Sequence, residues 1–386
     1  MDSYAIKYIG LLCLLLAFVS CKKKNQNSLP ETLKKDLATI NYAKGFSIEK
    51  LTSGITIIKV YSPWPDADEA FNYALVPKEL LTQAKLNKND FDAIISVPVE
   101  RIIATSTTHI PALENLDVLD KLIGFPETRY ISSVATRKKI DKGKIIDLGN
   151  NESINTEIAL NLNPDLVMGF SINNQNKAYE TLQRSNIPIV YNGDWTEETP
   201  LGKAEWIKFF APFFGLEEKA ENLFKTTEEN YLAAKALAKK ATNKPTVLSG
   251  ALYKDVWYLP GGKSWAASFI NDANADYLWR NTNATGSLSL SVESVLAKAA
   301  DASFWVSPSQ FISYYELDKA SRHYHRFKAY KEKKIYTFAN TKGETGGLLF
   351  YELGPARPDL ILKDLIYIFH PELLPEHELF FFKPLL

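Results

Sequence analysis

The stretch 155-NTEIALNLNPDLVM-168 recurs in outline as 291-SVESVLAKAADASF-304, so one structural unit is encoded twice in this chain. Both copies begin with a residue suited to the N-cap of a helix, Asn155 and Ser291, and carry an acid two positions later, Glu157 and Glu293. A short helix, an aspartate and a buried strand then follow in the same order. Two similar lobes of alternating helix and strand are therefore expected.

A long apolar stripe lies between the two copies. It keeps helical spacing to about Ala241 and consists of Leu216, Ala220, Leu223, Phe224, Tyr231, Ala234 and Ala238. A preceding helix is predicted from Pro200 to Phe214, with Thr199 as the N-cap and proline at the first helical position. A helix this long in the middle of the chain predicts a stiff connection between the two lobes.

Strand and helix signals alternate from Arg101 onward. We expect strands at 102–104, 166–168 and 187–191 and helices at 110–122 and 177–185, and the alternation restarts at 246–248 and continues to about His370. Strands separated by such helices imply right-handed crossovers. The predicted fold class is α/β, with two Rossmann-like lobes of mostly parallel sheets joined by one long backbone helix and a small strand-rich N-terminal extension.

The 386 residues suit two lobes and not one ordinary domain. The stretch 54-GITIIKVY-61, rich in β-branched residues, places strands before Arg101. The expected division is a signal peptide over 1–20, a lipid-anchored tether over 21–44, a strand-rich extension over 45–100, an N-terminal binding lobe over 101–198, linking helices over 199–244 and a C-terminal binding lobe over 245–386.

The composition is that of a globular protein, with 46% hydrophobic and 12% aromatic residues. The chain has 45 basic and 45 acidic residues and therefore no formal net charge. A nucleic-acid partner is disfavoured, because phosphate neutralisation needs a basic excess or a basic patch.

The first 20 residues have the pattern of a secretory signal. Lys7 supplies positive charge and Ile9 to Val19 is apolar apart from Gly10. Eleven helical residues rise about 16 Å, too short for the roughly 30 Å of bilayer hydrocarbon. We expect this segment to be removed after Ser20.

The sequence 18-FVSC-21 resembles a lipobox, the site where bacterial lipoproteins are cleaved and lipidated on the new N-terminal cysteine, although Phe18 stands where leucine is commonest. Cys13 lies in the discarded segment, so Cys21 is the only thiol of the mature chain. The predicted location is the periplasmic face of a bacterial membrane, anchored through lipid on Cys21. The alternative is an ordinary signal peptide followed by a free thiol.

Six segments carry a family resemblance through their order and spacing. They are 101-RIIATSTTHIPAL-113, 163-NPDLV-167, 199-TPLGKAEW-206, 257-WYLPGGKS-264, 272-DANADYLW-279 and 352-ELGPARPD-359. Together they resemble the iron-chelate and vitamin B12 class of periplasmic binding proteins of ABC importers. The resemblance implies a protein that captures an iron chelate, such as a siderophore or haem, or a corrinoid between its lobes. It also implies delivery to a permease driven by an ATPase, and a stiff linking helix that permits only small opening.

Ligands of paired α/β lobes sit at the carboxyl ends of the strands, in the crevice between them. The loops expected there are 106–109, 171–176 and 194–195 in the first lobe and 253–263, 307–310 and 340–347 in the second. The predicted ligand-binding residues are Thr107, Thr108, His109, Ser171, Asn174, Trp195, Tyr253, Trp257, Tyr258, Lys263, Gln310, Asn340, Lys342 and Tyr351.

These residues fall into groups by chemistry. Flat rings with polar edges suit a bulky chelate and come from Trp195, Tyr253, Trp257, Tyr258 and Tyr351. Hydroxyls and amides would orient it, the two lysines would pair with an anionic ligand, and His109 is a candidate axial ligand for a haem or cobalt centre. The alternatives remain open: Trp257 and Tyr258 packed under the Gly261–Gly262 turn, solvated lysines, and a histidine that caps or packs.

Other chemistry has little support in the sequence. His323 and His325 would share one face of an extended segment, but Arg322 and Arg326 flank them unfavourably for a cation, so no metal site and no cofactor is predicted. No GxSxG, HExxH, phosphate-binding loop or dinucleotide fingerprint occurs, and the chain is not expected to be an enzyme. The resemblance suggests permease docking for Glu157 and Glu293, which helix capping also explains.

Alternative functions belong to different classes. A molybdate or other oxyanion carrier of the same fold would use backbone N–H groups and hydroxyls in place of aromatic walls. A lipid-anchored periplasmic hydrolase would need two carboxylates facing one cleft, and a surface adhesin would show a large apolar patch. The expected partners are a small-molecule ligand, the permease and ATPase subunits and the membrane, and the chain is expected to be a monomer.

Overall fold

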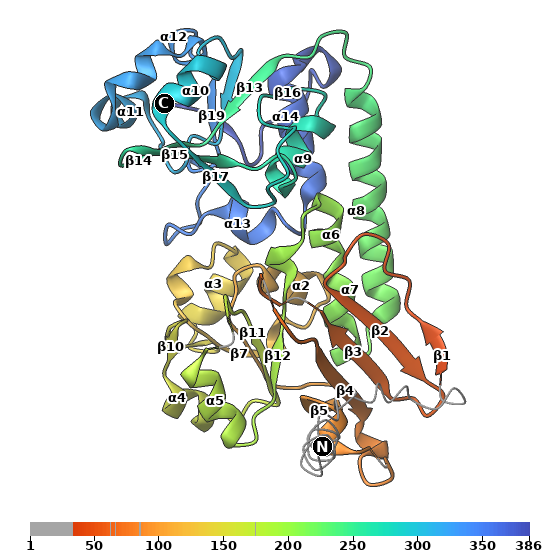
Figure 1. Cartoon of the computed structure of the whole chain (residues 1–386). Coiled ribbons are helices and arrows are strands. Elements are labelled where there is room, and N and C mark those ends of the chain that lie inside the picture. Colours follow the sequence, from red (N-terminus) through yellow and green to blue (C-terminus); the bar gives the residue numbers. More distant parts are fainter. Residues whose placement is uncertain (1–33, 62, 66, 85, 174) are drawn as a thin grey trace, which may run out of the picture. The chain divides into compact units, whose positions relative to one another are not determined.

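The computed structural model of this chain describes residues 34–386 except 62, 66, 85 and 174 (Figure 1). The N-terminal lobe is built on a five-stranded sheet of order β12-β11-β6-β7-β8, in which all neighbouring strands run parallel. Its strands are β6 (Ile102–Ala104), β7 (Leu122–Phe125), β8 (Ile146–Asp147), β11 (Leu166–Gly169) and β12 (Ile189–Tyr191). The strands β6, β11 and β12 are fully buried and β7 is buried except for Ile123, as expected for a parallel sheet covered on both faces.

The C-terminal lobe repeats this plan with the order β16-β13-β18-β19-β20, parallel except for the β19–β20 pair. Its strands are β13 (Thr246–Ser249), β16 (Asp276–Tyr277), β18 (Phe304–Val306), β19 (Ile335–Thr337) and β20 (Lys383–Pro384). An antiparallel sheet of β14 (Ala251–Tyr253), β15 (Val256–Pro260) and β17 (Ser287–Leu290) is added to this lobe.

Another five-stranded sheet precedes the N-terminal lobe and has the order β1-β2-β3-β4-β5. It comprises β1 (Lys34–Leu37), β2 (Phe46–Leu51), β3 (Thr56–Val60), β4 (Phe71–Pro77) and β5 (Ala93–Val97). Its apolar face merges with the core of the N-terminal lobe: Phe46 packs on Trp206 at 4.6 Å between ring centroids, and the hydroxyl of Tyr73 accepts a hydrogen bond from the N–H of Tyr191. The strand-rich extension is therefore part of one continuous core with this lobe.

Two buried glutamates attach the segment before β2 to the linking helices. The Glu205 carboxylate accepts hydrogen bonds from the backbone N–H groups of 41–43 at 2.7–3.1 Å and pairs with Lys208. Glu197 accepts from the N–H groups of 44 and 45 at 2.8 Å. A buried carboxylate needs such donors to offset its desolvation.

The helix between the lobes is α8 (Glu217–Ala238), a single uninterrupted helix that confirms the prediction (Figure 1). It packs against α7 (Ile207–Phe210) at one end and against α14 (Pro358–Phe369) of the C-terminal lobe. The remaining helices are α2 (His109–Asn115), α3 (Val134–Asp141), α4 (Thr156–Asn161), α5 (Lys177–Arg184), α6 (Pro200–Glu205), α9 (Trp265–Asp272), α10 (Val292–Ala299), α11 (Tyr314–Ala320), α12 (Lys328–Lys331) and α13 (Leu349–Leu353).

The predicted helix caps are confirmed. The side chain of Asn155 accepts from the N–H of Ile158, that of Ser291 from Ser294, and that of Thr199 from Gly202. The doubled segment therefore forms α4 with β11 in one lobe and α10 with β18 in the other.

Two predicted helices are shorter than expected. The helix predicted over 110–122 ends at Asn115, because Asp117 adopts a left-handed backbone with φ of 60° and Leu122 opens the buried strand β7. The helix predicted over 200–214 is broken after Glu205 and again at a 3-10 turn that contains Pro212, which cannot donate to the helical ladder.

Candidate functional site

The two lobes are joined at their facing ends by the carboxylate of Glu352, which lies on α13 of the C-terminal lobe. This carboxylate accepts hydrogen bonds from the backbone N–H groups of Ser132, at 2.5 Å, and Ser133, at 2.8 Å, in the N-terminal lobe. Glu352 is only 2% exposed, so the two N–H groups and the carboxylate satisfy one another away from water. We refer to this contact as the Glu352 latch.

The loop before α13 fits tightly against the same segment. A side chain on Gly343 would lie 2.5 Å from the Cα of Ser132, and one on Gly347 would lie 2.1 Å from the carbonyl oxygen of Tyr130. Only glycine therefore permits this approach of the two backbones. The hydroxyl of Thr345 donates to the carbonyl of Arg129 at 2.7 Å and adds to the contact between the lobes.

Burial raises the pKa of Glu352 to about 7, and the neighbouring carboxylate of Glu114 adds to the rise. Glu114 accepts hydrogen bonds from the hydroxyls of Ser133 and Thr136. Two carboxylates thus approach the 132–133 segment from opposite lobes, and the ionisation of Glu352 is coupled to the contact between the lobes.

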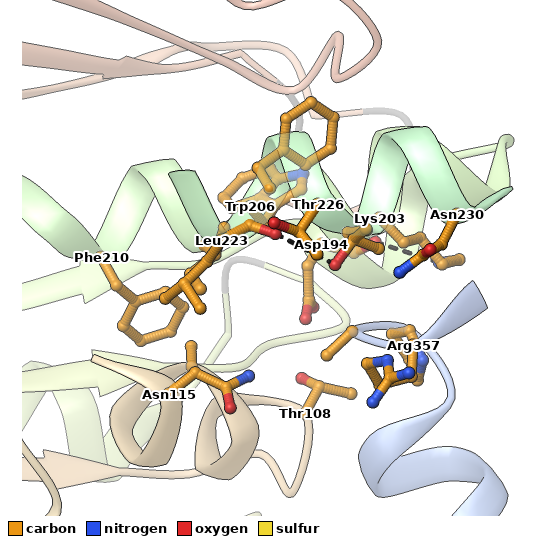
Figure 2. A pocket seen from close by; sticks show the side chains of 17 residues that line it. Thr108, Asn115, Asp194, Lys203, Trp206, Phe210, Leu223, Thr226, Asn230 and Arg357 are labelled. Carbon is orange, nitrogen blue, oxygen red and sulfur yellow. Dashed lines mark hydrogen bonds between the residues drawn. The ribbon is translucent and has the colours of Figure 1, made fainter. Parts of the chain in front are cut away.

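A cavity of about 270 Å³ lies where the N-terminal lobe, the linking helices and the C-terminal lobe meet; we call it the junction cavity (Figure 2). Its walls come from α2 and the residue before it, from Asp194, from α6 to α8 and from the 355–357 turn. It is lined by Thr108, Ala112, Asn115, Asp194, Lys203, Ala204, Trp206, Ile207, Phe210, Leu223, Phe224, Thr226, Thr227, Asn230, Pro355, Ala356 and Arg357.

Buried charges stand at one side of this cavity. Asp194 is buried, and its pKa is raised by desolvation although Lys203 and a hydrogen bond with Thr108 favour the carboxylate. The ammonium of Lys203 donates to the carbonyls of Asp194, at 3.0 Å, and Trp195, at 2.8 Å. Burial lowers the pKa of Lys203 to about 8, because the charged form is desolvated.

Among the predicted ligand residues of the N-terminal lobe that the structure describes, Thr108 lines the junction cavity and the others do not. Thr107 is half-buried, and Ser171 is buried with its hydroxyl bonded to the carbonyl of Asn173. Trp195 is half-buried, packs against Phe170 and donates from its indole N–H to the carbonyl of Pro63. Asn174 lies outside the described residues.

His109 is completely buried against Phe210, and neither of its ring nitrogens finds a hydrogen-bond partner among the described residues. Desolvation lowers its pKa to about 3, so the imidazole is neutral. The expectation that His109 reaches a metal centre as an axial ligand is not met in this structure, because the helix α2 turns the ring into the core.

The predicted residues of the C-terminal lobe divide into exposed and buried ones. Tyr253 and Tyr258 are 67% and 43% exposed with their rings 6.5 Å apart, and Tyr351 is 47% exposed beside Glu352 on α13. The prediction that Trp257 contacts ligand does not agree with the structure, in which its ring is fully buried against Trp305 and Phe327. Side chains alternate along a strand, so the ring of Trp257 lies on the face opposite that of Tyr258. The polar members Lys263, Gln310 and Lys342 are exposed, and Asn340 donates to the carbonyl of Ile312.

Several residues at the junction had no role in the sequence prediction. All four of these residues, Lys203, Glu205, Glu352 and Arg357, stand in the segments that carry the family resemblance, but the pattern assigns them no ligand-binding role. The sequence feature that could have identified them is a charged residue inside an otherwise apolar segment. The helix α6, for example, is buried along its whole length although it carries Lys203 and Glu205. A charged side chain in such a helix must find a partner from elsewhere in the fold.

The proposed docking residues Glu157 and Glu293 are exposed in the first turns of α4 and α10. The lipidation site, Cys21, lies outside the described residues. Over residues 34–386, with four positions excepted, no helix is long and apolar enough to span a bilayer. The same part of the chain contains no group of three or more His, Cys, Asp or Glu side chains arranged to hold a metal ion.

A family model described as "Periplasmic binding protein" matches residues 102–341. The chain belongs to this family of periplasmic binding proteins, which confirms the predicted family at that level. Members of the family are solute-binding proteins and not enzymes; they take small-molecule ligands and work with an ABC permease.

The similar proteins cover most of the chain. An uncharacterized lipoprotein of Methanocaldococcus jannaschii, MJ0878, is 27% identical over 97% of this chain and 95% of its own length. A periplasmic binding protein from Veillonella parvula has the same fold, with a TM-score of 0.59 at 15% identity over 91% of this chain and 99% of that one. A possible iron-binding protein from Staphylococcus epidermidis gives a TM-score of 0.56 at 20% identity over 71% and 99%.

Proposed function

We propose that this chain is the substrate-binding lipoprotein of an ABC importer and captures an iron chelate, a siderophore or haem, or a corrinoid between its lobes. Membership of the family carries the role of solute carrier. The ligand class rests on one observation, the exposed rings of Tyr253, Tyr258 and Tyr351 on the C-terminal lobe. The fold shared with a possible iron-binding protein supports the same class.

Large exposed rings are the feature that a chelate or macrocycle requires. Tyr253 and Tyr258 lie on the paired strands β14 and β15, and each presents an apolar face with a polar hydroxyl edge. Tyr351 precedes Glu352, the residue that joins the lobes, so its ring stands at the junction between them. A ligand that stacks on these rings would contact the C-terminal lobe and approach the N-terminal lobe.

The membrane anchor is proposed from the sequence together with a relative. The 18-FVSC-21 segment resembles a lipobox, and the Methanocaldococcus jannaschii relative that matches 97% of this chain is described as a lipoprotein. Lipid on Cys21 would hold the carrier at the outer face of the membrane that contains the permease.

The test uses the soluble chain from residue 22 onward, titrated with haemin, a ferric catecholate siderophore and cyanocobalamin while tryptophan fluorescence is followed. We expect one of these chelates to bind with 1:1 stoichiometry. The variants Tyr258→Ala and Tyr351→Ala should weaken that chelate at least tenfold, which corresponds to about 1.4 kcal/mol.

A matched control is Tyr315→Ala, because Tyr315 is 71% exposed but lies on α11, away from the junction. This control should bind like the wild type. Equal weakening by all three substitutions would contradict the assignment of the site. Binding of molybdate with no response to any chelate would replace the proposed ligand class with an oxyanion.

A further inference from the structure

The junction cavity is lined by the carboxylate of Asp194, one of whose two oxygens is unpaired within the described part of the chain. Oδ1 of Asp194 is buried and has no hydrogen-bond partner among the described residues. Figure 2 shows the Asp194 side chain directed toward Thr108, into the space of the cavity. A buried carboxylate oxygen without a donor costs free energy, so a molecule that brings an N–H donor to this oxygen would be stabilised there.

A cationic hydrogen-bond donor, the guanidinium of Arg357, also lines the cavity. Arg357 is held by Asp359, which accepts from its Nε and Nη2 at 2.9 Å each, while Nη1 is the guanidinium nitrogen that Asp359 does not engage. Thr108 also lines the cavity, and its hydroxyl is a hydrogen-bond partner of Asp194 and of Ser106. The charged lining of the cavity thus includes the Asp194 carboxylate, the Arg357 guanidinium and the ammonium of Lys203, which already donates to two backbone carbonyls.

Apolar side chains line much of the remaining cavity, together with the polar side chains of Asn115, Thr226, Thr227 and Asn230. Trp206, Phe210 and Phe224 are buried, and Leu223 of α8 closes the wall opposite α2. A volume of about 270 Å³ is below the roughly 300–1,000 Å³ of sites for drug-sized ligands, so a haem or corrinoid does not fit. The shape and chemistry suit a small molecule that has a zwitterionic head and an apolar body.

The geometry points to a second binding site in the junction cavity, for a free α-amino acid with an apolar side chain. The ammonium of the amino acid donates to Oδ1 of Asp194, and its carboxylate accepts from Arg357. The side chain lies against Phe210 and Leu223. This site is distinct from the proposed chelate site, because the exposed tyrosines do not line it.

Isothermal titration of the chain from residue 22 onward with L-leucine tests this inference. We expect 1:1 binding, and at least tenfold weaker binding of 4-methylpentanoate, which lacks the ammonium, and of isoamylamine, which lacks the carboxylate. Asp194→Asn should also weaken leucine at least tenfold, because the amide retains the shape of the carboxylate without its charge. Absence of heat and of a thermal shift with wild-type protein at millimolar leucine would overturn the proposal.

A cavity-filling variant and its control test the same site if Asp194→Asn fails to fold. Leu223→Trp places a large ring in the cavity from a half-buried position on α8 and should abolish leucine binding. Leu232→Trp is the matched control, because Leu232 is 44% exposed on the same helix and does not line the cavity. Unchanged leucine binding by Leu223→Trp would contradict the location of the site.

The chelate titrations described above are repeated on the same variants. Leu223→Trp should keep chelate binding while it loses leucine. This pattern separates a failure of the amino-acid site from a failure of the proposed carrier function, since each ligand then reports on its own site.

Discussion

The carboxylate of Glu352 accepts the backbone N–H of Ser132 at 2.5 Å, although the two residues are 220 positions apart in the chain and belong to different lobes. The bond exists only when the lobes are in contact. The Glu352 latch therefore stabilises the closed arrangement, and its removal is expected to favour separation of the lobes.

Glu352→Ala should open the lobes. The substitution leaves the N–H groups of Ser132 and Ser133 without their acceptor, and the loss of a charge-assisted pair of this kind costs about 3 kcal/mol. Small-angle X-ray scattering should show a larger radius of gyration than for the wild type. Glu344→Ala, at an exposed position of the loop before α13, is the control and should scatter like the wild type. Identical curves for all three proteins would contradict the latch.

The stability of the protein should fall as the pH rises through 7, because of Glu352. Its pKa is about 7 in the folded protein and near 4.5 when exposed, so between these values the folded state binds the extra proton. The contribution of this proton to the free energy of unfolding is fully present below pH 4.5 and is lost above pH 7, and it amounts to about 3 kcal/mol. Urea unfolding of wild type and Glu352→Gln from pH 4.5 to 8 measures this difference, and a constant difference would refute it.

His109→Leu should stabilise the protein. Both ring nitrogens of His109 are buried without partners, and leucine is close to histidine in size, so we expect a gain of about 1–3 kcal/mol at neutral pH. The folded pKa of about 3 lies below the unfolded value of 6.5. The contribution of neutral His109 to the stability of the wild type is therefore present above pH 6.5 and is lost as the pH falls towards 3. The difference in free energy of unfolding between His109→Leu and the wild type should increase as the pH falls. Thermal unfolding followed by circular dichroism tests both points.

Glu205→Ala should release the segment before β2. Its carboxylate is the acceptor for three backbone N–H groups and the partner of Lys208, so its removal is expected to cost about 3–5 kcal/mol. Limited proteolysis should cleave near Asn41 in the variant before it cleaves either lobe. Glu229→Ala, exposed on α8, serves as the comparison and should resist cleavage like the wild type.

Cys21→Ser should move the protein from the membrane fraction to the soluble fraction. Lipid on this cysteine is the proposed anchor, and without acyl chains no other strong membrane attachment is predicted. Cys13→Ser changes a cysteine of the segment that is removed, so this variant should remain in the membrane fraction. Retention of both variants in the membrane would argue against lipidation of Cys21.

The local features of this fold were predictable because neighbouring residues determine them. The caps at Asn155 and Ser291, the strands around Leu166 and Phe304 and the long helix α8 follow from propensity, capping and periodicity within a few turns of chain. The family followed from the order of such segments. The same local reasoning failed for Trp257, since alternation along β15 does not say which face meets the core.

The sequence by itself determined the two-lobed α/β architecture, the stiff helix between the lobes and the class of solute carrier. Only the tertiary structure decided that Glu352 meets Ser132, that Asp194 and Arg357 line one cavity and that His109 is enclosed. The physical reason is that each of these relationships joins residues far apart in the chain. Their free energies depend on desolvation and on hydrogen-bond distance, which exist only once the lobes have packed together.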